Sequence, residues 1–322
     1  MKNNLGFTAF LTVLILFFAI SAFGWDDTGH KISSYIAWQQ MTPDVREKVI
    51  AVLLEAPEDA QLSTFYLPYN SRSDGAKKLE FFMIASTWPD IVRDRKFPNR
   101  FKKYHKGNWH YSDDFWRSVN GKVEFLPAPD DGGKAVEKLF EFEKLLRDPS
   151  GDKHEKALAV AWIEHIVGDI HQPLHTSARV TETEPKGDQG GNLFHLTPAN
   201  TPRDQQVNLH WFWDSIIGRN ITRKNDACDS DYVDPIARSL MKKYSYDKLR
   251  GRINGGKYEE WQDEGVKLAI ADVFSSDLRR NEMPSKQYTQ KAFKLSEQQL
   301  AIAGYRMAEI FNSIFGAAGT NQ

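Results

Sequence analysis

Two short segments each place a histidine and an aspartate four residues apart, and this spacing constrains the fold more than any other feature. In HIVGDIHQPLH the pair is His165 and Asp169, and in NLHWFWD it is His210 and Asp214. Residues four apart share one face of an α-helix. Two such pairs predict two helices that face each other across a polynuclear metal site, as in helical bundles with facing ligands.

Further histidines and aspartates are placed to join these pairs. His175 follows a proline that stops the first helix, and His30 in WDDTGH, Asp90 in WPD and His110 in WHYSD add three more candidates. Imidazole and carboxylate without thiolate favour zinc, although manganese and iron accept the same ligands. The alternative for either pair alone is a hydrogen-bonded surface pair or, in NLHWFWD, a histidine held in an aromatic core. The remaining histidines are interpreted as loop or exposed-face residues without a partner: His105, His154, His171 and His195.

The first 24 residues have the pattern of a secretory signal peptide. A basic start at Lys2 precedes an apolar stretch, and the small residues Ala22 and Gly24 fit an A-x-G cleavage site. The alternative is an uncleaved anchor helix, although the apolar run is short for a membrane span. The predicted mature protein therefore begins at Trp25 and is periplasmic or secreted, with no membrane anchor after processing.

The rest of the chain has the composition of one globular domain. Its hydrophobic fraction of 41% is enough for a large core, and no repeat or linker divides residues 25–322. The formal net charge of −1 predicts that any contact with nucleic acid is local, with a shallow dependence on salt. The single cysteine, Cys228, leaves an exported chain without an intrachain disulfide, so stability is expected from packing or from metal.

Periodicity predicts an all-α fold with at most a small β-ribbon. Apolar residues recur at helical spacing through most of the chain, and Thr42 and Pro43 suit the N-cap and first position of a helix. The best strand signal is KVEF at 122–125. Loops are expected over roughly 56–76, 94–131 and 176–207. Helices are expected at 28–41, from Pro43 onward, at 77–92 with an interruption at Pro89, and at 132–148, 154–170, 257–275 and 296–315.

The motifs WDDTGH, ASTWPD, WHYSD, HIVGDIHQPLH, GGN and NLHWFWD occur in this order. Together they resemble the zinc-dependent single-strand nucleases and 3′-nucleotidases, which share a mostly α-helical fold with zinc-dependent phospholipase C. The resemblance runs from Trp25 to Asp214, and the last helix is similar as well. It implies an enzyme with three zinc ions per chain that hydrolyses single-stranded DNA and RNA to 5′-nucleotides, and 3′-nucleotides as well, by attack of a zinc-bound hydroxide on phosphorus.

The resemblance also implies which residues would hold the three ions. The first set is Asp90, His110, His165 and Asp169, and the second is His175, His210 and Asp214. The third set is His30, Asp169 as a bridging carboxylate, and the α-amino nitrogen and carbonyl oxygen of Trp25. Because Trp25 has a free α-amine only after the signal peptide is removed, processing would complete the site.

Four other residues match positions that the family uses on its substrates. Asp113 matches a carboxylate that orients the nucleophile, with an ordinary partner of His110 as the alternative. Arg93 matches a basic position near the scissile phosphate, with an exposed arginine at a helix end as the alternative. Tyr111 would stack an unpaired base, and Asn192 of GGN would bind a base edge or phosphate. Pro89 replaces an aromatic found in fungal members, which weakens the match at the base site. The loop between His175 and GGN is long and polar, so base preference does not transfer.

Two competing functions remain at this point. A phospholipase C of the same fold is disfavoured because the loops are charged and Asp214 stands where that class tends to carry glutamate. A non-catalytic zinc-binding protein is disfavoured because Asp113 accompanies a complete set of ligands. The expected partners are single-stranded nucleic acid and 3′-nucleotides as substrates, with no obligate protein partner.

Overall fold

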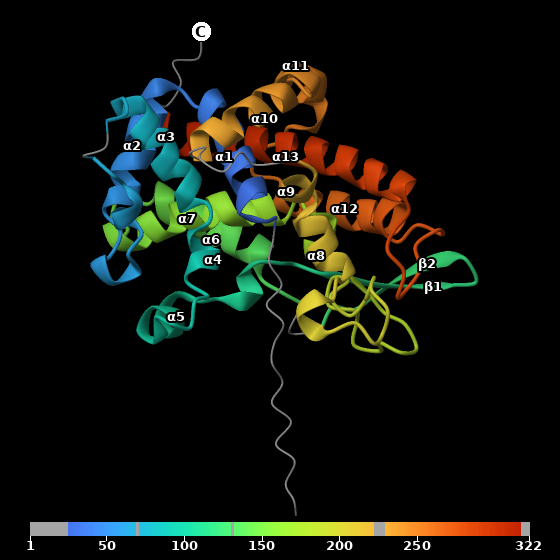
Figure 1. The fold of residues 1–322 in the computed structure, drawn as a ribbon. Helices are drawn as coiled ribbons and strands as arrows, with labels where there is room; N and C mark the ends of the chain where they lie inside the picture. Colours follow the sequence, from blue (N-terminus) through green and yellow to red (C-terminus); the bar gives the residue numbers. More distant parts are fainter. Residues whose placement is uncertain (1–24, 69–70, 130–131, 222–228, 317–322) are drawn as a thin grey trace, which may run out of the picture.

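The computed structural model describes residues 25–68, 71–129, 132–221 and 229–316, and these are mostly helical (Figure 1). The predicted signal peptide and Cys228 lie outside the described residues. The all-α prediction is confirmed. No helix in the described ranges is long and apolar enough to cross a membrane. The helices are α1 (Asp27–Gln40), α2 (Pro43–Leu54), α3 (Asp74–Ala85), α4 (Trp88–Ile91), α5 (Pro98–Tyr104), α6 (Ala135–Arg147), α7 (Lys153–Asp169), α8 (Leu209–Asp214), α9 (Ile216–Asn220), α10 (Asp229–Lys243), α11 (Tyr246–Leu249), α12 (Tyr258–Leu268) and α13 (Lys286–Phe315).

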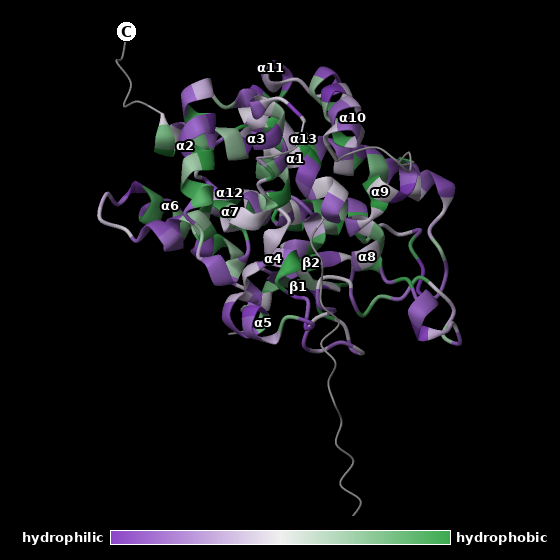
Figure 2. Cartoon of the chain, turned by 60° about the vertical axis from the view of Figure 1, so that its left-hand side comes forward, coloured by the Kyte–Doolittle hydropathy of each residue, from purple (hydrophilic) through white to green (hydrophobic). Residues whose placement is uncertain are grey.

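Helices from the beginning, middle and end of the chain pack together at the centre. The first helix, α1, lies along α13, and both contact α7 (Figure 1). A Cβ added to Gly304 of α13 would lie only 2.6 Å from the carbonyl oxygen of Ser33 and the Cβ of Ile36, both on α1. The absence of a side chain at this glycine therefore permits the close approach of the two helices. Figure 2 shows green hydrophobic residues toward the interior and purple hydrophilic ones on the outer helices.

Helix boundaries follow local capping signals. The side chain of Thr42 accepts a hydrogen bond from the amide of Val45, and Pro43 begins α2 as predicted. The expected helix over 77–92 is divided differently. It begins earlier, at Asp74 after the cap residue Ser73, and ends at Ala85. Pro89 then lies in the first turn of the separate helix α4. Amides of the first turn have no partner within a helix, so the missing N–H of proline costs no hydrogen bond there.

A small sheet lies beside the helices. Its strands are β1 (Asp114–Val119), β2 (Lys122–Leu126) and β3 (Ser177–Arg179), in the order β2-β1-β3. Strand β2 contains the predicted ribbon and runs antiparallel to β1, with Phe115 opposite Leu126. Strand β3 runs parallel to β1, with Asp114 opposite Ser177.

The expectation of a continuous loop over 94–131 was wrong, because α5, β1 and β2 lie within it. Strand β3 likewise lies inside the loop expected over 176–207. The pairing of β1 with β3 joins segments distant in sequence, so no local pattern marks either strand. Helix α5 is a single short element of seven residues, too brief to show a helical period.

Candidate metal centre

Histidines from three segments converge on the carboxylate of Asp169 at the end of α7. Its Oδ2 lies 3.1 Å from His165 Nε2 and 3.1 Å from His110 Nδ1, and its Oδ1 lies 3.2 Å from His30 Nε2. All four side chains are fully buried. The pair four apart on α7 thus forms the centre of the cluster, and the segments that begin α1 and precede β1 complete it.

Asp90 of α4 lies at the edge of the same cluster. Its Oδ1 is 3.7 Å from His165 Nε2 and 4.0 Å from His110 Nδ1. The guanidinium of Arg93 pairs with the same oxygen at 3.1 Å. Ligand atoms of His110, His165 and Asp169, and likewise those of His30, Asp90 and His165, lie close enough together to hold one metal ion.

A second group forms where α8 meets the turn after α7. His210 Nε2 lies 3.4 Å from Asp214 Oδ2, and His175 Nε2 lies 3.9 Å from Asp214 Oδ1. The side chain of Asn208 caps α8 by accepting a hydrogen bond from the Trp211 amide at 2.7 Å. These three ligand side chains are also buried and lie within reach of one ion.

Backbone carbonyls set the orientation of three imidazoles. The Nδ1 atoms of His165, His175 and His210 each lie 2.7 Å from a carbonyl oxygen, which belongs to Ser86, His110 and Gly190 respectively. Because a carbonyl only accepts, Nδ1 carries the proton and donates, and Nε2 keeps an unprotonated lone pair that can bind a metal ion. Each Nε2 points to the neighbouring carboxylate, which is the arrangement that a metal-binding histidine requires.

His30 fits the first group through close packing. Its ring stacks on that of His165 with centroids 4.0 Å apart and an angle of 16° between the planes. A Cβ on Gly168 would lie 2.6 Å from His30 Nδ1, so only glycine at this position of α7 leaves room for the ring. Burial lowers the pKa of His30, so the neutral, metal-binding form is favoured.

The pKa values of Asp169 and Asp214, which each share a helix with a ligand histidine, are shifted in opposite directions. Burial alone would raise the pKa of Asp169, but His165, His175 and the hydrogen bond from His110 hold it well below the usual value. Burial raises the pKa of Asp214 well above its usual value, and the hydrogen bond from Gln172 only partly offsets this. Burial also lowers the pKa of His110 to about 3, helped by the charge of Arg93.

The donor set fits a divalent cation. The buried oxygens Asp169 Oδ1 and Asp214 Oδ2 accept no hydrogen bond within the described residues. Buried carboxylate oxygens without donors cost free energy unless a cation compensates them. Imidazole nitrogens and carboxylate oxygens in these numbers are the ligands that zinc takes in proteins.

Trp25 is linked to the second group through its neighbour in the chain. Its side chain is fully buried, and the amide of the following residue, Asp26, donates to the carbonyl of Asp214 at 3.0 Å. The start of the described chain is therefore tied to the helix that carries the second group. Chelation by the α-amine of Trp25 remains a prediction.

Among the four residues matched to substrate positions, Arg93 contacts the candidate ligand Asp90, Tyr111 and Asp113 follow His110 closely in the chain, and Asn192 bonds to the cap residue of α8. Asp113 is buried directly before the first residue of β1, and its amide donates to the carbonyl of Gly132 at 2.7 Å. Tyr111 adjoins His110 directly in the chain. Asn192 is largely buried, donates to the carbonyl of Gln189 at 2.9 Å, and accepts from Asn208 at 3.3 Å. Arg93 contacts Asp90, as described above.

Spacing in the sequence missed one supporting residue, Gln172, and led to the wrong position for another, His171. Gln172 donates to Asp214 Oδ1 at 2.6 Å and so links the exit of α7 to α8. His171 was placed on a loop or exposed face, but it is buried, and its Nε2 lies 2.9 Å from a nitrogen of Arg306 on α13. Its Nδ1 lies 2.7 Å from the carbonyl of Val167. His171 and Gln172 lie between Asp169 and His175 in the run HQP, and this position is the sequence signal that could have identified both.

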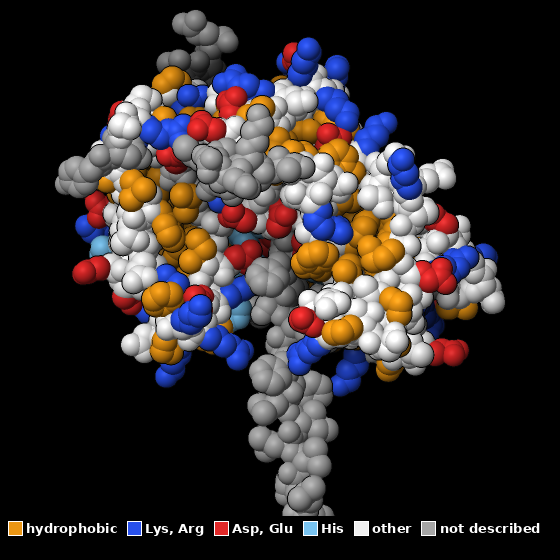
Figure 3. Space-filling model, viewed as in Figure 1, with side chains coloured by type: hydrophobic (Ala, Val, Ile, Leu, Met, Phe, Trp, Pro, Cys, Tyr) orange, Lys and Arg blue, Asp and Glu red, His pale blue; other side chains and the backbone are white. Residues whose placement is uncertain are grey.

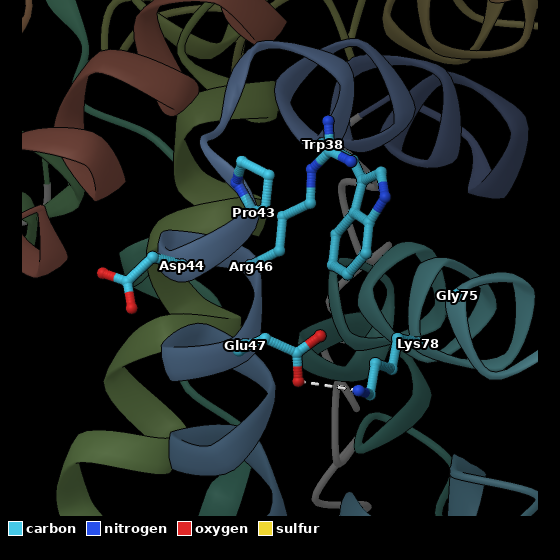
Figure 4. A pocket seen from close by; sticks show the side chains of 7 residues that line it. All are labelled: Trp38, Pro43, Asp44, Arg46, Glu47, Gly75 and Lys78. Atoms are coloured by element: carbon cyan, nitrogen blue, oxygen red, sulfur yellow. Dashed lines mark hydrogen bonds and ion pairs between the residues drawn. The ribbon is translucent and has the colours of Figure 1, made fainter.

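A separate pocket lies between the end of α1, α2 and α3 (Figure 4). The ion pair of Lys78 with Glu47, at 2.7 Å, closes one side. None of the candidate ligands lines it, so it is distinct from the metal centre. The lining residues are Trp38, Pro43, Asp44, Arg46, Glu47, Gly75 and Lys78.

Comparisons with known proteins agree with this geometry. Endonuclease 2 of Arabidopsis thaliana is 22% identical, with 95% of this chain and 96% of the relative covered. Nuclease S1 of Aspergillus oryzae is 23% identical over 89% and 90%, and nuclease P1 of Penicillium citrinum is 19% identical over 91% and 98%. The S1/P1 nuclease family model matches residues 25–316, which include every candidate ligand. The chain therefore belongs to the S1/P1 nuclease family, and it is a hydrolase of the nuclease type.

Proposed function

We propose that this protein is an exported nuclease with three zinc ions, which hydrolyses single-stranded DNA and RNA to 5′-nucleotides and also hydrolyses 3′-nucleotides. The observation that carries the proposal is the convergence of His30, His110 and His165 on one buried carboxylate, Asp169. A second group of three ligands lies beside it. Membership of the S1/P1 nuclease family supports the same reaction class.

Each ion has a set of donors. The first would be held by Asp90, His110, His165 and Asp169, and the second by His175, His210 and Asp214. The third would be held by His30, by Asp169 as a bridge, and by the α-amine and carbonyl of Trp25. The short contacts from Asp169 to both His30 and His110 support its bridging role.

Zinc bound here would supply an activated water and a Lewis acid for phosphoryl oxygens. Asp113, three residues after His110, would accept a hydrogen bond from the attacking water and hold it in line with the departing 3′ oxygen. The Arg93 guanidinium, which forms an ion pair with Asp90, would donate to a phosphate oxygen and balance the negative charge of the phosphate. Tyr111 would stack the base, and Asn192 would bind its edge or the phosphate.

Preference for single strands follows from this chemistry. The ligand atoms are buried, so the scissile phosphate must enter a recess together with its neighbouring base. A paired base reaches such a recess only after it unstacks, which costs a few kcal/mol. Stacking on an aromatic side chain contributes about 1–3 kcal/mol for any unpaired base.

Export would complete the site. The family match begins at residue 25, which is also the predicted first residue of the mature chain. A free α-amine at Trp25 would place a nitrogen donor beside the buried Asp26–Asp214 contact. The proposal therefore couples removal of residues 1–24 to binding of the third ion, and it places the enzyme in the periplasm or outside the cell.

The test combines three measurements on the exported protein. We expect N-terminal sequencing to give Trp25, metal analysis to give about three zinc ions per chain, and zinc-dependent release of acid-soluble nucleotides from single-stranded DNA and RNA. Hydrolysis of a 3′-nucleotide is measured in parallel, with phosphatidylcholine as the control substrate. A different N-terminus with one zinc or none would contradict the third ion. Hydrolysis of phosphatidylcholine but not of nucleic acid would contradict the nuclease function.

A further inference from the structure

The segment between two of the candidate ligands is strongly basic, although the whole chain is not. Residues 93–106, named here the α5 basic segment, read RDRKFPNRFKKYHK and contain seven lysine or arginine residues against one acidic residue. The formal net charge of the whole protein is −1. The cationic residues of the α5 basic segment are Arg93, Arg95, Lys96, Arg100, Lys102, Lys103 and Lys106.

Some of these cations anchor the segment. Arg100 is buried and donates to the side chain of Gln61 at 2.7 Å. Lys103 and Tyr104 both contact the carboxylate of Asp59 at 2.6 Å. These bonds fix α5 against the turn that follows α2, so the segment is held in place while its outer face is free for other contacts.

Other cations face solvent with no ion pair. Arg95, Lys96 and Lys102 are exposed, and none forms an ion pair with another part of the chain that the structure describes. Figure 3 shows blue lysine and arginine side chains gathered at the lower left, where α5 lies in Figure 1. Unpaired cations on a fixed surface attract a polyanion, and counterions are released when it binds.

Aromatic rings lie among these cations. Phe97 is 47% exposed, and the guanidinium of Arg100 lies 4.5 Å from its ring centroid. The guanidinium of Arg95 lies 5.2 Å from the ring of Phe101, which also stacks on His105 at 4.8 Å. Cations combined with exposed aromatic faces are typical of surfaces that bind unpaired nucleotides.

The segment is continuous with the metal centre. It begins three residues after Asp90 and ends four residues before His110, and Arg93 pairs with Asp90 at 3.1 Å. The segment therefore touches the metal centre at Arg93, and its other cations continue from that point along the chain.

We propose that the α5 basic segment binds the sugar-phosphate backbone of the single-stranded substrate beyond the scissile phosphate, and that Phe97 offers a face on which an unpaired base stacks. This inference rests on the proposed nuclease function and adds a second contact surface to it. Long strands are then bound more tightly than mononucleotides. The salt dependence for long strands is steeper than the net charge of the whole chain predicts.

The test compares two triple variants. One carries Arg95→Gln, Lys96→Gln and Lys102→Gln. The matched control carries Arg250→Gln, Lys242→Gln and Lys248→Gln, which remove the same types of exposed side chain near α11. Helix α11 lies at the top of the molecule and α5 at the bottom in both ribbon views (Figures 1 and 2).

We measure kcat and KM for an oligothymidylate of about 20 nucleotides and for 3′-thymidylate, from about 50 to 200 mM salt. In the α5 variant we expect KM for the oligonucleotide to rise about tenfold at the lowest salt. The slope of log KM against log salt should fall by about 2, since each phosphate contact to a single strand contributes about 0.7. Values for 3′-thymidylate should stay within about twofold of wild type, because a mononucleotide has no neighbouring phosphates.

An oligonucleotide KM that changes no more than in the control overturns the inference. An equal rise for 3′-thymidylate also overturns it, because the variant would then have disturbed the metal centre. If the wild-type protein hydrolyses neither substrate, the proposed function fails. Fluorescence anisotropy of the labelled oligonucleotide with the zinc-chelated proteins then reports binding by itself, and equal affinities of the two variants would overturn the inference independently.

Discussion

The two histidine–aspartate pairs share one spacing but sit in different surroundings. Asp169 has three imidazoles within 3.2 Å, and His165, His175 and His110 hold its pKa well below the usual value against the effect of burial. Asp214 has two imidazoles at 3.4 and 3.9 Å, and burial raises its pKa well above the usual value. The same motif therefore places one carboxylate where its neighbours favour the charged form and another where burial disfavours it.

The helices that carry the pairs differ as well. Asp169 ends α7, a helix of 17 residues that is buried along most of its length. Asp214 ends α8, which has six residues and depends on the Asn208 cap and on the Gln172 hydrogen bond. Both helices are packed in the core, α8 through Leu209, Phe212 and Trp213, but α8 is much shorter and gains its cap and one ligand contact from local hydrogen bonds.

The largest predicted effect is on metal content and activity. Asp169→Asn should lose two zinc ions and lower kcat/KM for single-stranded DNA by about 10³-fold or more, because a bridging carboxylate serves two ions. Asp214→Asn should lose one ion only. Metal analysis of the purified variants checks both expectations. A full zinc complement in Asp169→Asn would rule out the bridging role.

A smaller effect should appear in the zinc-free protein. The pKa of Asp169 is lowered on folding, so its stabilising contribution is present above the unfolded value and lost as pH falls through the folded value. The pKa of Asp214 is raised, so its contribution is present below the unfolded value and lost as pH rises through the folded value. At pH 7, Asp169→Asn should therefore destabilise the chelated protein by about 3 kcal/mol. Asp214→Asn should leave it unchanged or more stable.

Urea denaturation with a chelator present, at about pH 7 and again at about pH 4, measures this difference. The difference in free energy of unfolding between the two variants should be smaller at the lower pH, where the wild-type Asp214 is neutral. Destabilisation of similar size in both variants would mean that the two carboxylates have the same charge state in the folded chain, contrary to the comparison.

The smallest predicted effect concerns the helix caps. Asn208→Ala and Asp152→Ala each remove a side chain that accepts from backbone amides at the start of α8 or α7, and each should cost about 1 kcal/mol. Only Asn208→Ala should also weaken zinc binding, by about tenfold for one ion, because the cap fixes a short ligand helix. Thermal denaturation and competition with a chelating dye distinguish the two effects. Equal zinc affinities in the two variants would show that α8 needs no cap to place its ligands.

Many of the helices were predictable from the sequence, because the regular spacing of apolar residues in a long helix is visible within one segment. The pairs on α7 and α8 were found for the same reason, since four-residue spacing is a property of one element. The convergence of His30 and His110 on Asp169 was not deducible from spacing, because it depends on tertiary packing between distant segments. The family resemblance supplied that arrangement.

Other features could not be predicted, either because the net charge averages over the whole chain or because the residues involved show no regular spacing in the sequence. The net charge of −1 concealed the α5 basic segment, because acidic residues elsewhere cancel it in the sum. His171 appeared to lack a partner because Arg306 lies 135 residues away in the sequence. Strand β1 likewise pairs with β3, a segment distant in the sequence, and neither carries a strong alternating pattern.

The contact between His171 and Arg306 has a consequence for how the protein is made. The exit of α7 is held by a side chain of the last helix, and that helix also lies along the first one. A ribosome delivers Arg306 only after nearly all of residues 25–316 have been made, so this contact forms late in synthesis. The hydrogen bond that fastens the exit of α7, between the candidate ligands Asp169 and His175, is therefore among the last to form.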